Sequence, residues 1–77
     1  MRQIIDLKAN DNLTLEVTFS GGEIKIYDVK PILNCEAFNA LTDVSQFKKV
    51  HNNGYFIEWE CEADLSADTL YIDGVAK

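Results

Sequence analysis

The chain has 77 residues, of which 47% are hydrophobic and 26% charged, and its 13 acidic and 7 basic residues give a net charge of −6. This length predicts one domain spanning residues 1–77, and the composition is typical of a globular protein and excludes a disordered one. No apolar run approaches the roughly 18 residues of a membrane span, and an acidic chain with scattered Lys and Arg disfavours direct nucleic-acid binding.

The first ten residues and the two cysteines bear on the cellular compartment. MRQIIDLKAN has neither the long apolar stretch nor the small-residue cleavage site of a signal peptide. We therefore expect a cytoplasmic protein that makes no membrane contact. Cys35 and Cys61 lie 26 positions apart and form no C-x-x-C pair. In a reducing compartment they are expected to be free thiols without bound metal.

The first third of the chain predicts three antiparallel strands. Residues 13–19 alternate apolar and polar side chains, and residues 3–9 and 24–28 continue this period of two. Together with a later strand at residues 55–60, these strands are expected to bury one face, which consists of Ile5, Leu7, Leu15, Val17, Phe19, Ile24, Ile26, Ile57 and Trp59.

The register of the second and third strands follows from the turn between them. Residues 21–22 are both glycine, and two central residues that take positive φ are typical of a two-residue hairpin loop. This loop pairs Phe19 with Ile24 and Val17 with Ile26.

Short helices are expected in the middle of the chain. Pro31 ends the third strand, because it donates no ladder hydrogen bond. Residues 35–41 and 42–50 then space their apolar side chains at i, i+3, and Thr42 or Asp43 is the expected N-cap of the second segment.

The last third predicts another hairpin and a helical turn. Residues 53–54 are Asn-Gly, the strongest short hairpin signal, and residues 55–60 alternate as a strand. Residues 64–71 predict a capped helical turn, and residues 72–77 a frayed tail. The whole pattern predicts an α+β fold, with an antiparallel sheet of about four or five strands and two short helices packed on one face.

The most charged feature is a row of carboxylates at every second position: Glu58, Glu60, Glu62 and Asp64. Same-face neighbours on a strand lie about 6.5–7 Å apart, so these groups do not converge on a metal ion. We interpret Glu58 and Glu60 as part of a solvated acidic surface that binds a partner. Whether all four acids share one strand face, or a turn after Trp59 breaks the row, stays open.

Catalytic and cofactor sites are not indicated. Cys35, His51 and Cys61 lack the spacing of a zinc site, and nothing pairs a nucleophile with a base. We predict no catalytic residue, no metal and no cofactor, and therefore a protein that is not an enzyme.

Four segments in order resemble a known family: LTLEVTFSGGEIKIYDVKPIL, AFNALTDVSQFKKV, GYFIEW and ADLSADTLY. They are similar to a bacterial and phage family catalogued as domain of unknown function 2442, over about Ile4 to Tyr71. Two departures stand out. Cys61 and Glu62 replace a turn-forming Asn-Gly of the family, and Ala67 replaces a frequent Pro. If the family's turn is kept, the strand ends near Trp59 or Glu60.

The resemblance implies no activity, cofactor or catalytic residue. Some relatives lie beside a second small protein, in an arrangement like a toxin–antitoxin pair, and others append a helix-turn-helix domain. We therefore expect a protein-interaction or regulatory module with a basic protein partner, with the antitoxin-like half of a pair as the specific case. The alternative is an accessory domain of a DNA-linked transcriptional regulator whose DNA contact lies in another chain. Whether the chain forms homo-oligomers stays open.

Overall fold

The computed structural model describes residues 2–77, and within them the strands form two antiparallel sheets. The strands are β1 (Ile4–Ala9), β2 (Thr14–Phe19), β3 (Ile24–Asp28), β4 (Val50–Asn52), β5 (Phe56–Trp59), β6 (Asp64–Ser66) and β7 (Val75–Ala76). The helices are η1 (Lys30–Ile32) and η2 (Glu36–Thr42), which are 3-10 helices, and α1 (Val44–Phe47) and α2 (Ala67–Asp73). The predicted α+β class is confirmed, but the strands are divided between a four-stranded and a three-stranded sheet.

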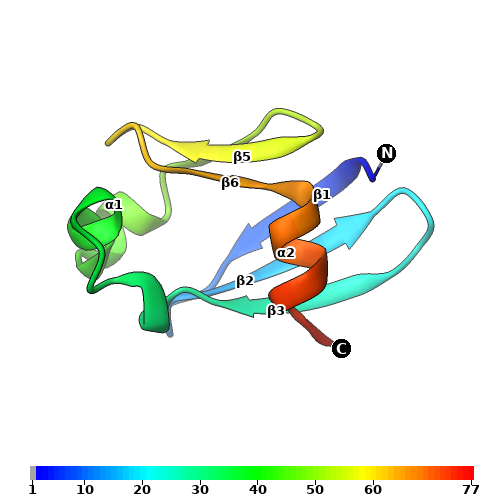
Figure 1. The fold of residues 1–77 in the computed structure, drawn as a ribbon, viewed down its shortest axis with the longest axis horizontal. Helices are drawn as coiled ribbons and strands as arrows, with labels where there is room; N and C mark the ends of the chain where they lie inside the picture. Colours follow the sequence, from blue (N-terminus) through cyan, green and yellow to red (C-terminus); the bar gives the residue numbers. More distant parts are fainter. Residues whose placement is uncertain (1) are drawn as a thin grey trace.

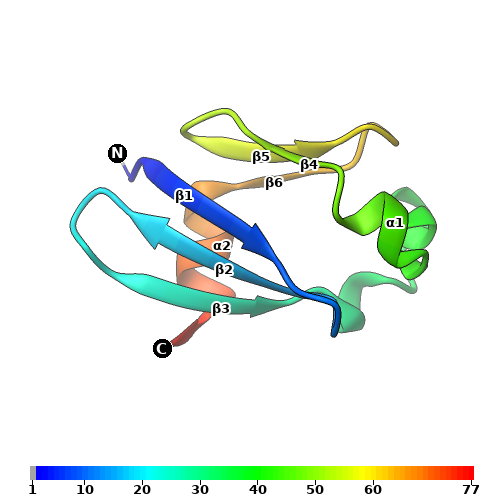
Figure 2. The ribbon, with the colours of Figure 1, turned by 180° about the vertical axis from the view of Figure 1, so that it is seen from behind.

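The two sheets and the helices form layers around a shared core. The first sheet has the order β1-β2-β3-β7, and the second has the order β4-β5-β6. Helix α2 lies across one face of the first sheet (Figure 1), and the opposite face, turned toward the viewer in Figure 2, carries no helix. The second sheet lies along the β1 side of the first, and η2 and α1 close one end of the molecule.

Trp59 joins the end helices to the second sheet. Its side chain is 2% exposed, and its indole Nε1–H donates a hydrogen bond to the backbone carbonyl of Phe47 at 2.8 Å. Its ring stacks on the ring of Phe47, with centroids 6.2 Å apart, and meets Phe38 edge-on. The short helices predicted from the apolar spacing of the middle segment each bury one side chain: Leu41 in η2 and Phe47 in α1.

The loop between β2 and β3 differs from the predicted two-residue turn. It has three residues, Ser20–Gly22, closed by hydrogen bonds from Phe19 N to Glu23 O (2.8 Å) and from Gly22 N to Phe19 O (2.9 Å). Gly22 has a φ of 91°, and Gly21 does not take positive φ. A three-residue hairpin of this kind needs one left-handed residue where the two-residue turn needs two.

One extra loop residue reverses the faces of β3. Leu15 pairs with Tyr27, so the predicted pairing of core residues with Ile24 and Ile26 is wrong. Tyr27 and Val29 enter the core, with exposed fractions of 4% and 0%, while Ile24 and Ile26 are half-buried on the other face. A one-residue change of register moves every side chain of a strand to the opposite face.

The first strand also departs from the expected burial. The register shifts between Ile4 and Asp6, which marks a bulge in β1. The bulge places Ile4 in the core at 2% exposure, while Ile5 is 57% exposed and Leu7 only half-buried. The expectation that Ile5 is a core residue is therefore wrong.

Both α-helices begin at a capping side chain. The carboxylate of Asp43 accepts a hydrogen bond from Ser45 N at 3.0 Å, and the hydroxyl of Ser66 accepts one from Thr69 N at 3.1 Å. These bonds satisfy backbone donors that have no partner inside the helix. Hydrogen bonds from the Ser45 hydroxyl and N–H lower the pKa of Asp43 below its ordinary value.

The segment expected to fray is ordered by pairing. Helix α2 continues to Asp73, and β7 adds to the edge of β3, where Val75 pairs with Ile26. The ammonium of Lys77 then forms an ion pair with Glu16 at 2.8 Å. The expectation of a frayed tail at residues 72–77 is corrected accordingly.

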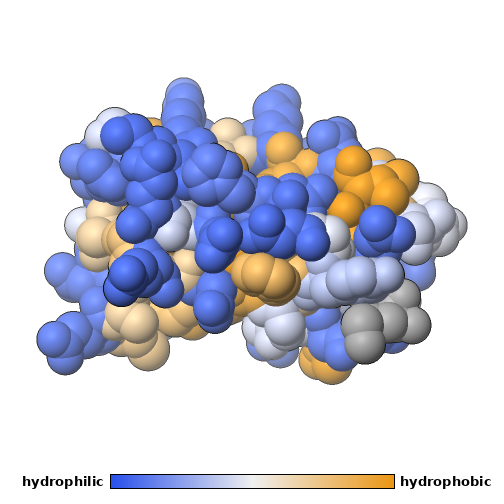
Figure 3. Space-filling model, turned by 90° about the horizontal axis from the view of Figure 1, so that it is seen from above, coloured by the Kyte–Doolittle hydropathy of each residue, from blue (hydrophilic) through white to orange (hydrophobic). Residues whose placement is uncertain are grey.

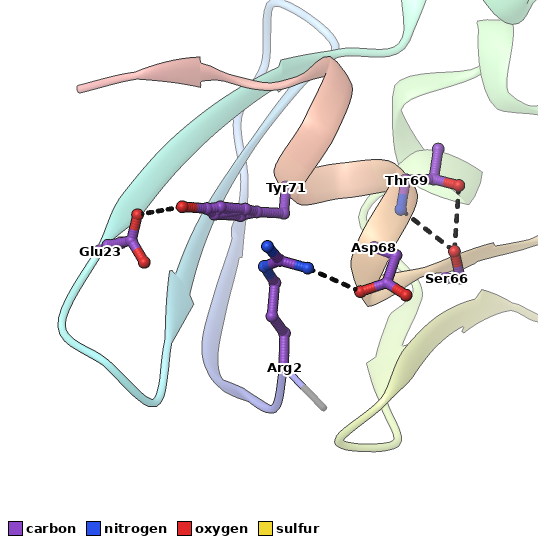
Figure 4. Close-up of polar contacts among 6 residues, drawn as sticks. All are labelled: Arg2, Glu23, Ser66, Asp68, Thr69 and Tyr71. Carbon is purple, nitrogen blue, oxygen red and sulfur yellow. Dashed lines mark hydrogen bonds and ion pairs between the residues drawn. The ribbon is translucent and has the colours of Figure 1, made fainter.

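A cluster of polar contacts fastens α2 to the first sheet (Figure 4). The guanidinium of Arg2 lies 3.8 Å from the centre of the Tyr71 ring and donates to Asp68 at 3.1 Å. The hydroxyl of Tyr71 donates to Glu23 at 2.5 Å, which raises the pKa of Tyr71 above its ordinary value. The segment ADLSADTLY therefore supplies a cap, a core leucine (Leu70) and this surface contact.

Candidate functional site

The outer face of the second sheet and the turn after β5 carry the carboxylates that the sequence singled out. Glu58 and Glu60 are exposed, while the alternating Ile57 and Trp59 are buried at 0% and 2% exposure. Period two in this strand therefore places the side chains as expected. We call the exposed carboxylates of Glu58, Glu60 and Asp64 the acidic face.

A turn after Trp59 breaks the row of four acids. Strand β5 ends at Trp59, and the chain reverses through residues 60–62, closed by hydrogen bonds from Trp59 N to Ala63 O (2.9 Å) and from Glu62 N to Trp59 O (3.0 Å). This is the bonding pattern of the Ser20–Gly22 loop. Glu62 takes the left-handed position, with a φ of 71°, that Gly22 takes in the other loop.

Replacing Glu62 with glycine is expected to stabilise the protein by about 1 kcal/mol, because a residue with a Cβ is strained at positive φ. Urea denaturation followed by circular dichroism would measure the change. Glu62→Ala is the matched control: it removes the same carboxylate but keeps the Cβ, so it should not raise stability. Equal stabilisation by both variants would assign the effect to charge and contradict backbone strain.

The turn brings Asp64 directly opposite Glu58 on the neighbouring strand, and His51 lies opposite Glu58 on the other side. Like charges directly opposite each other on a sheet destabilise it. Within residues 2–77, Glu58 and Asp64 have no ion-pair partner: Glu58 accepts a hydrogen bond from the amide of Asn53 at 2.9 Å. Glu60 lies 3.9 Å from the ammonium of Lys49.

Exposed aromatic side chains adjoin the acidic face. Phe56 is 39% exposed and precedes Glu58 by two positions in β5, so both side chains lie on the outer face. Tyr55, in the hairpin loop before it, is 50% exposed. Figure 3 shows the molecule from above in the orientation of Figure 1: hydrophilic side chains cover most of this view, and hydrophobic ones appear in several separate places between them.

The other side chains that could bind a metal or act as nucleophiles are dispersed. Cys35 is exposed in the loop before η2, Cys61 is half-buried in the turn after β5, and both are free thiols. His51 is exposed on β4. No group of three or more His, Cys, Asp or Glu side chains in the described part of the chain, residues 2–77, is arranged to hold a metal ion.

A second feature, which the sequence did not reveal, is a cleft of about 490 Å³ at the edge of β3. Its lining comes from five elements, β2, β3, η1, α2 and β7, and consists of Thr14, Ile26, Tyr27, Asp28, Pro31, Ile32, Asp73 and Val75. The register of β3 and the pairing of β7 create it, and neither was predicted. Burial, followed by the charges of Asp73 and Asp28, raises the pKa of Tyr27 above its ordinary value.

Comparisons with known proteins give one match. The family model described as "Protein of unknown function (DUF2442)" matches residues 4–74. The chain matches no curated protein and no solved structure. Among the helices formed by residues 2–77, none has the length and apolar character needed to cross a membrane.

Proposed function

The chain belongs to the DUF2442 family, and we propose that this member is a protein-interaction module whose acidic face binds a basic surface of a partner protein. The module regulates that partner, and an antitoxin-like half of a two-protein pair is the specific form of the proposal. The family description states no activity, so the support comes from the residues of the face itself.

The observation that carries the proposal is the pairing of Glu58 with Asp64 across β5 and β6. A directly opposed pair of like charges costs roughly 0.2–1 kcal/mol of sheet stability. A cation placed between the two carboxylates by a partner would remove this repulsion. The pair therefore lowers the stability of the sheet, but it suits the binding of a basic group.

The surroundings of this pair fit a protein partner. Aromatic side chains are enriched at protein–protein interfaces, and Phe56 is exposed beside Glu58 on the same strand. The net charge of −6 would also steer a basic protein toward the module. Such steering raises the association rate more than the final affinity, and it weakens as salt screens the charges.

The test compares two charge reversals that change the net charge equally. Asp64→Lys places a cation opposite Glu58, while Glu36→Lys changes an exposed residue of η2. Wild type and both variants are used as bait in a lysate of the source cell, and captured proteins are purified and their association rates measured at low and high salt. We expect wild type to capture a basic protein. At low salt this protein should associate with Asp64→Lys at least fivefold more slowly than with wild type, and with Glu36→Lys as fast as with wild type.

The same variant separates binding from folding. Asp64→Lys should stabilise the protein by about 0.5 kcal/mol in urea denaturation at low salt, because it replaces a repulsive cross-strand pair with an attractive one. Loss of the partner together with raised stability cannot be attributed to unfolding. Partners captured equally by all three baits, or lost equally with both variants, would refute a role of the acidic face.

A further inference from the structure

The cleft at the edge of β3 lies where β7 stops. Strand β7 pairs with Lys25 and Ile26 only, so the edge of β3 at Tyr27 and Asp28 has no strand beside it. Figure 1 shows β3 running past the end of α2 toward the turn that holds η1. The cleft is therefore bounded by β7 and the end of α2 on one side and by η1 on the other.

Tyr27 lines this cleft with a nearly buried side chain. Tyr27 is only 4% exposed, yet its hydroxyl takes part in none of the side-chain hydrogen bonds found among residues 2–77. In the same residues no fully buried side-chain oxygen or nitrogen lacks a partner. The Tyr27 hydroxyl is therefore not fully enclosed, and because its residue lines the cleft, we infer that the hydroxyl reaches solvent there. A nearly buried tyrosine with a free hydroxyl is a group to which a ligand can bond.

Two carboxylates lie on the same cleft. Asp28 is already engaged, because its Oδ1 accepts a hydrogen bond from the backbone N–H of Lys30 and forms an ion pair with the Lys30 ammonium, both at 3.0 Å. Asp73, the last residue of α2, has no ion-pair partner among residues 2–77. Both carboxylates act on the Tyr27 phenol, whose pKa they raise after burial. The polar side of the cleft is thus negative, and it excludes anions.

The remaining wall is apolar. Ile26 and Ile32 are half-buried, and Val75 is 70% exposed at the edge of the cleft. A group that suits this cleft has an aliphatic stem for these side chains and a cationic head for Asp73 and the Tyr27 hydroxyl.

We propose that the cleft binds an arginine side chain of a partner protein, with the methylene stem against Ile26 and Val75 and the guanidinium on Asp73 and the Tyr27 hydroxyl. Arginine fits better than lysine, because a planar guanidinium donates to two acceptors at once and is less strongly hydrated than an ammonium. This contact is separate from the acidic face, so either can fail without the other.

The test titrates N-acetyl-arginine amide into the full chain labelled with ¹³C at the isoleucine and valine methyl groups. We expect saturable shifts at Ile26 and Val75, and none with the uncharged citrulline analogue. Asp73→Asn should raise the dissociation constant about tenfold, and Tyr27→Phe should raise it as well. Asp73 ends a helix, where an acid opposes the dipole, so Asn should not impair folding.

Matched controls identify the site. Glu36→Gln removes one carboxylate from the surface outside the cleft, and Asp64→Lys alters the acidic face; both should bind the probe like wild type. Equal affinity of wild type and Asp73→Asn, or equal binding of the citrulline analogue, would overturn the proposal. A lysine probe that binds more tightly than the arginine probe would overturn the choice of arginine.

Discussion

Replacing Trp59 with alanine is expected to lower the free energy of unfolding by about 3–5 kcal/mol. The indole is 2% exposed, stacks on Phe47 and meets Phe38 edge-on, so its removal leaves a cavity between the second sheet and the end helices. It also leaves the Phe47 carbonyl without its hydrogen bond. The total stability of a 77-residue domain is roughly 4–12 kcal/mol, so the variant should be close to unfolding.

Urea denaturation followed by circular dichroism measures this loss. Trp59→Phe keeps an aromatic ring and loses mainly the hydrogen bond, so it should cost less than alanine. Tyr55→Ala, at a residue that is 50% exposed, serves as the control for a surface aromatic and should cost about 1 kcal/mol or less. A Trp59→Ala protein as stable as Tyr55→Ala would show that the indole does not hold the end helices to the second sheet.

Replacing Gly74 with alanine is expected to destabilise the protein by about 1–3 kcal/mol and to release β7 from β3. The φ of Gly74 is −76°, which any residue adopts, so the effect arises from space. A Cβ at this position would lie closer to the Leu70 carbonyl oxygen than non-bonded atoms approach, and it would lie 3.0 Å from the Cβ of Lys25. The junction between α2 and β7 must then open.

Amide hydrogen exchange in the β3–β7 pair measures the release, and urea denaturation measures the stability. Gly21→Ala is the matched control, because a Cβ there meets only the flexible Glu23 carboxylate at 3.9 Å. It should change stability by no more than about 0.5 kcal/mol. Unchanged protection of Val75 and Ala76 in Gly74→Ala would show that the junction absorbs a methyl group without opening.

Features with a local cause could be read from the sequence. Alternation in LTLEVTF and FIEW placed Leu15, Val17, Ile57 and Trp59 in the core and Glu58 on the surface, because side chains of a strand point to opposite faces in turn. Capping is local as well, because one side chain satisfies one nearby backbone donor: Asp43 was one of the two residues expected to cap the segment of α1, and a capped turn was expected where α2 begins.

The α+β class and the exposure of Glu58 and Glu60 were therefore determined by the sequence, but the register of β3 was decided by the tertiary structure. The Gly-Gly pair allows either a two-residue or a three-residue loop, and the choice decides whether Ile26 or Tyr27 faces the core. In the same way, no local pattern predicts that Val75 pairs with Ile26, since this contact joins segments about fifty residues apart. The cleft depends on the register of β3 and on the pairing of β7 with β3, so packing between distant segments, and not any motif, places Tyr27 beside Asp73.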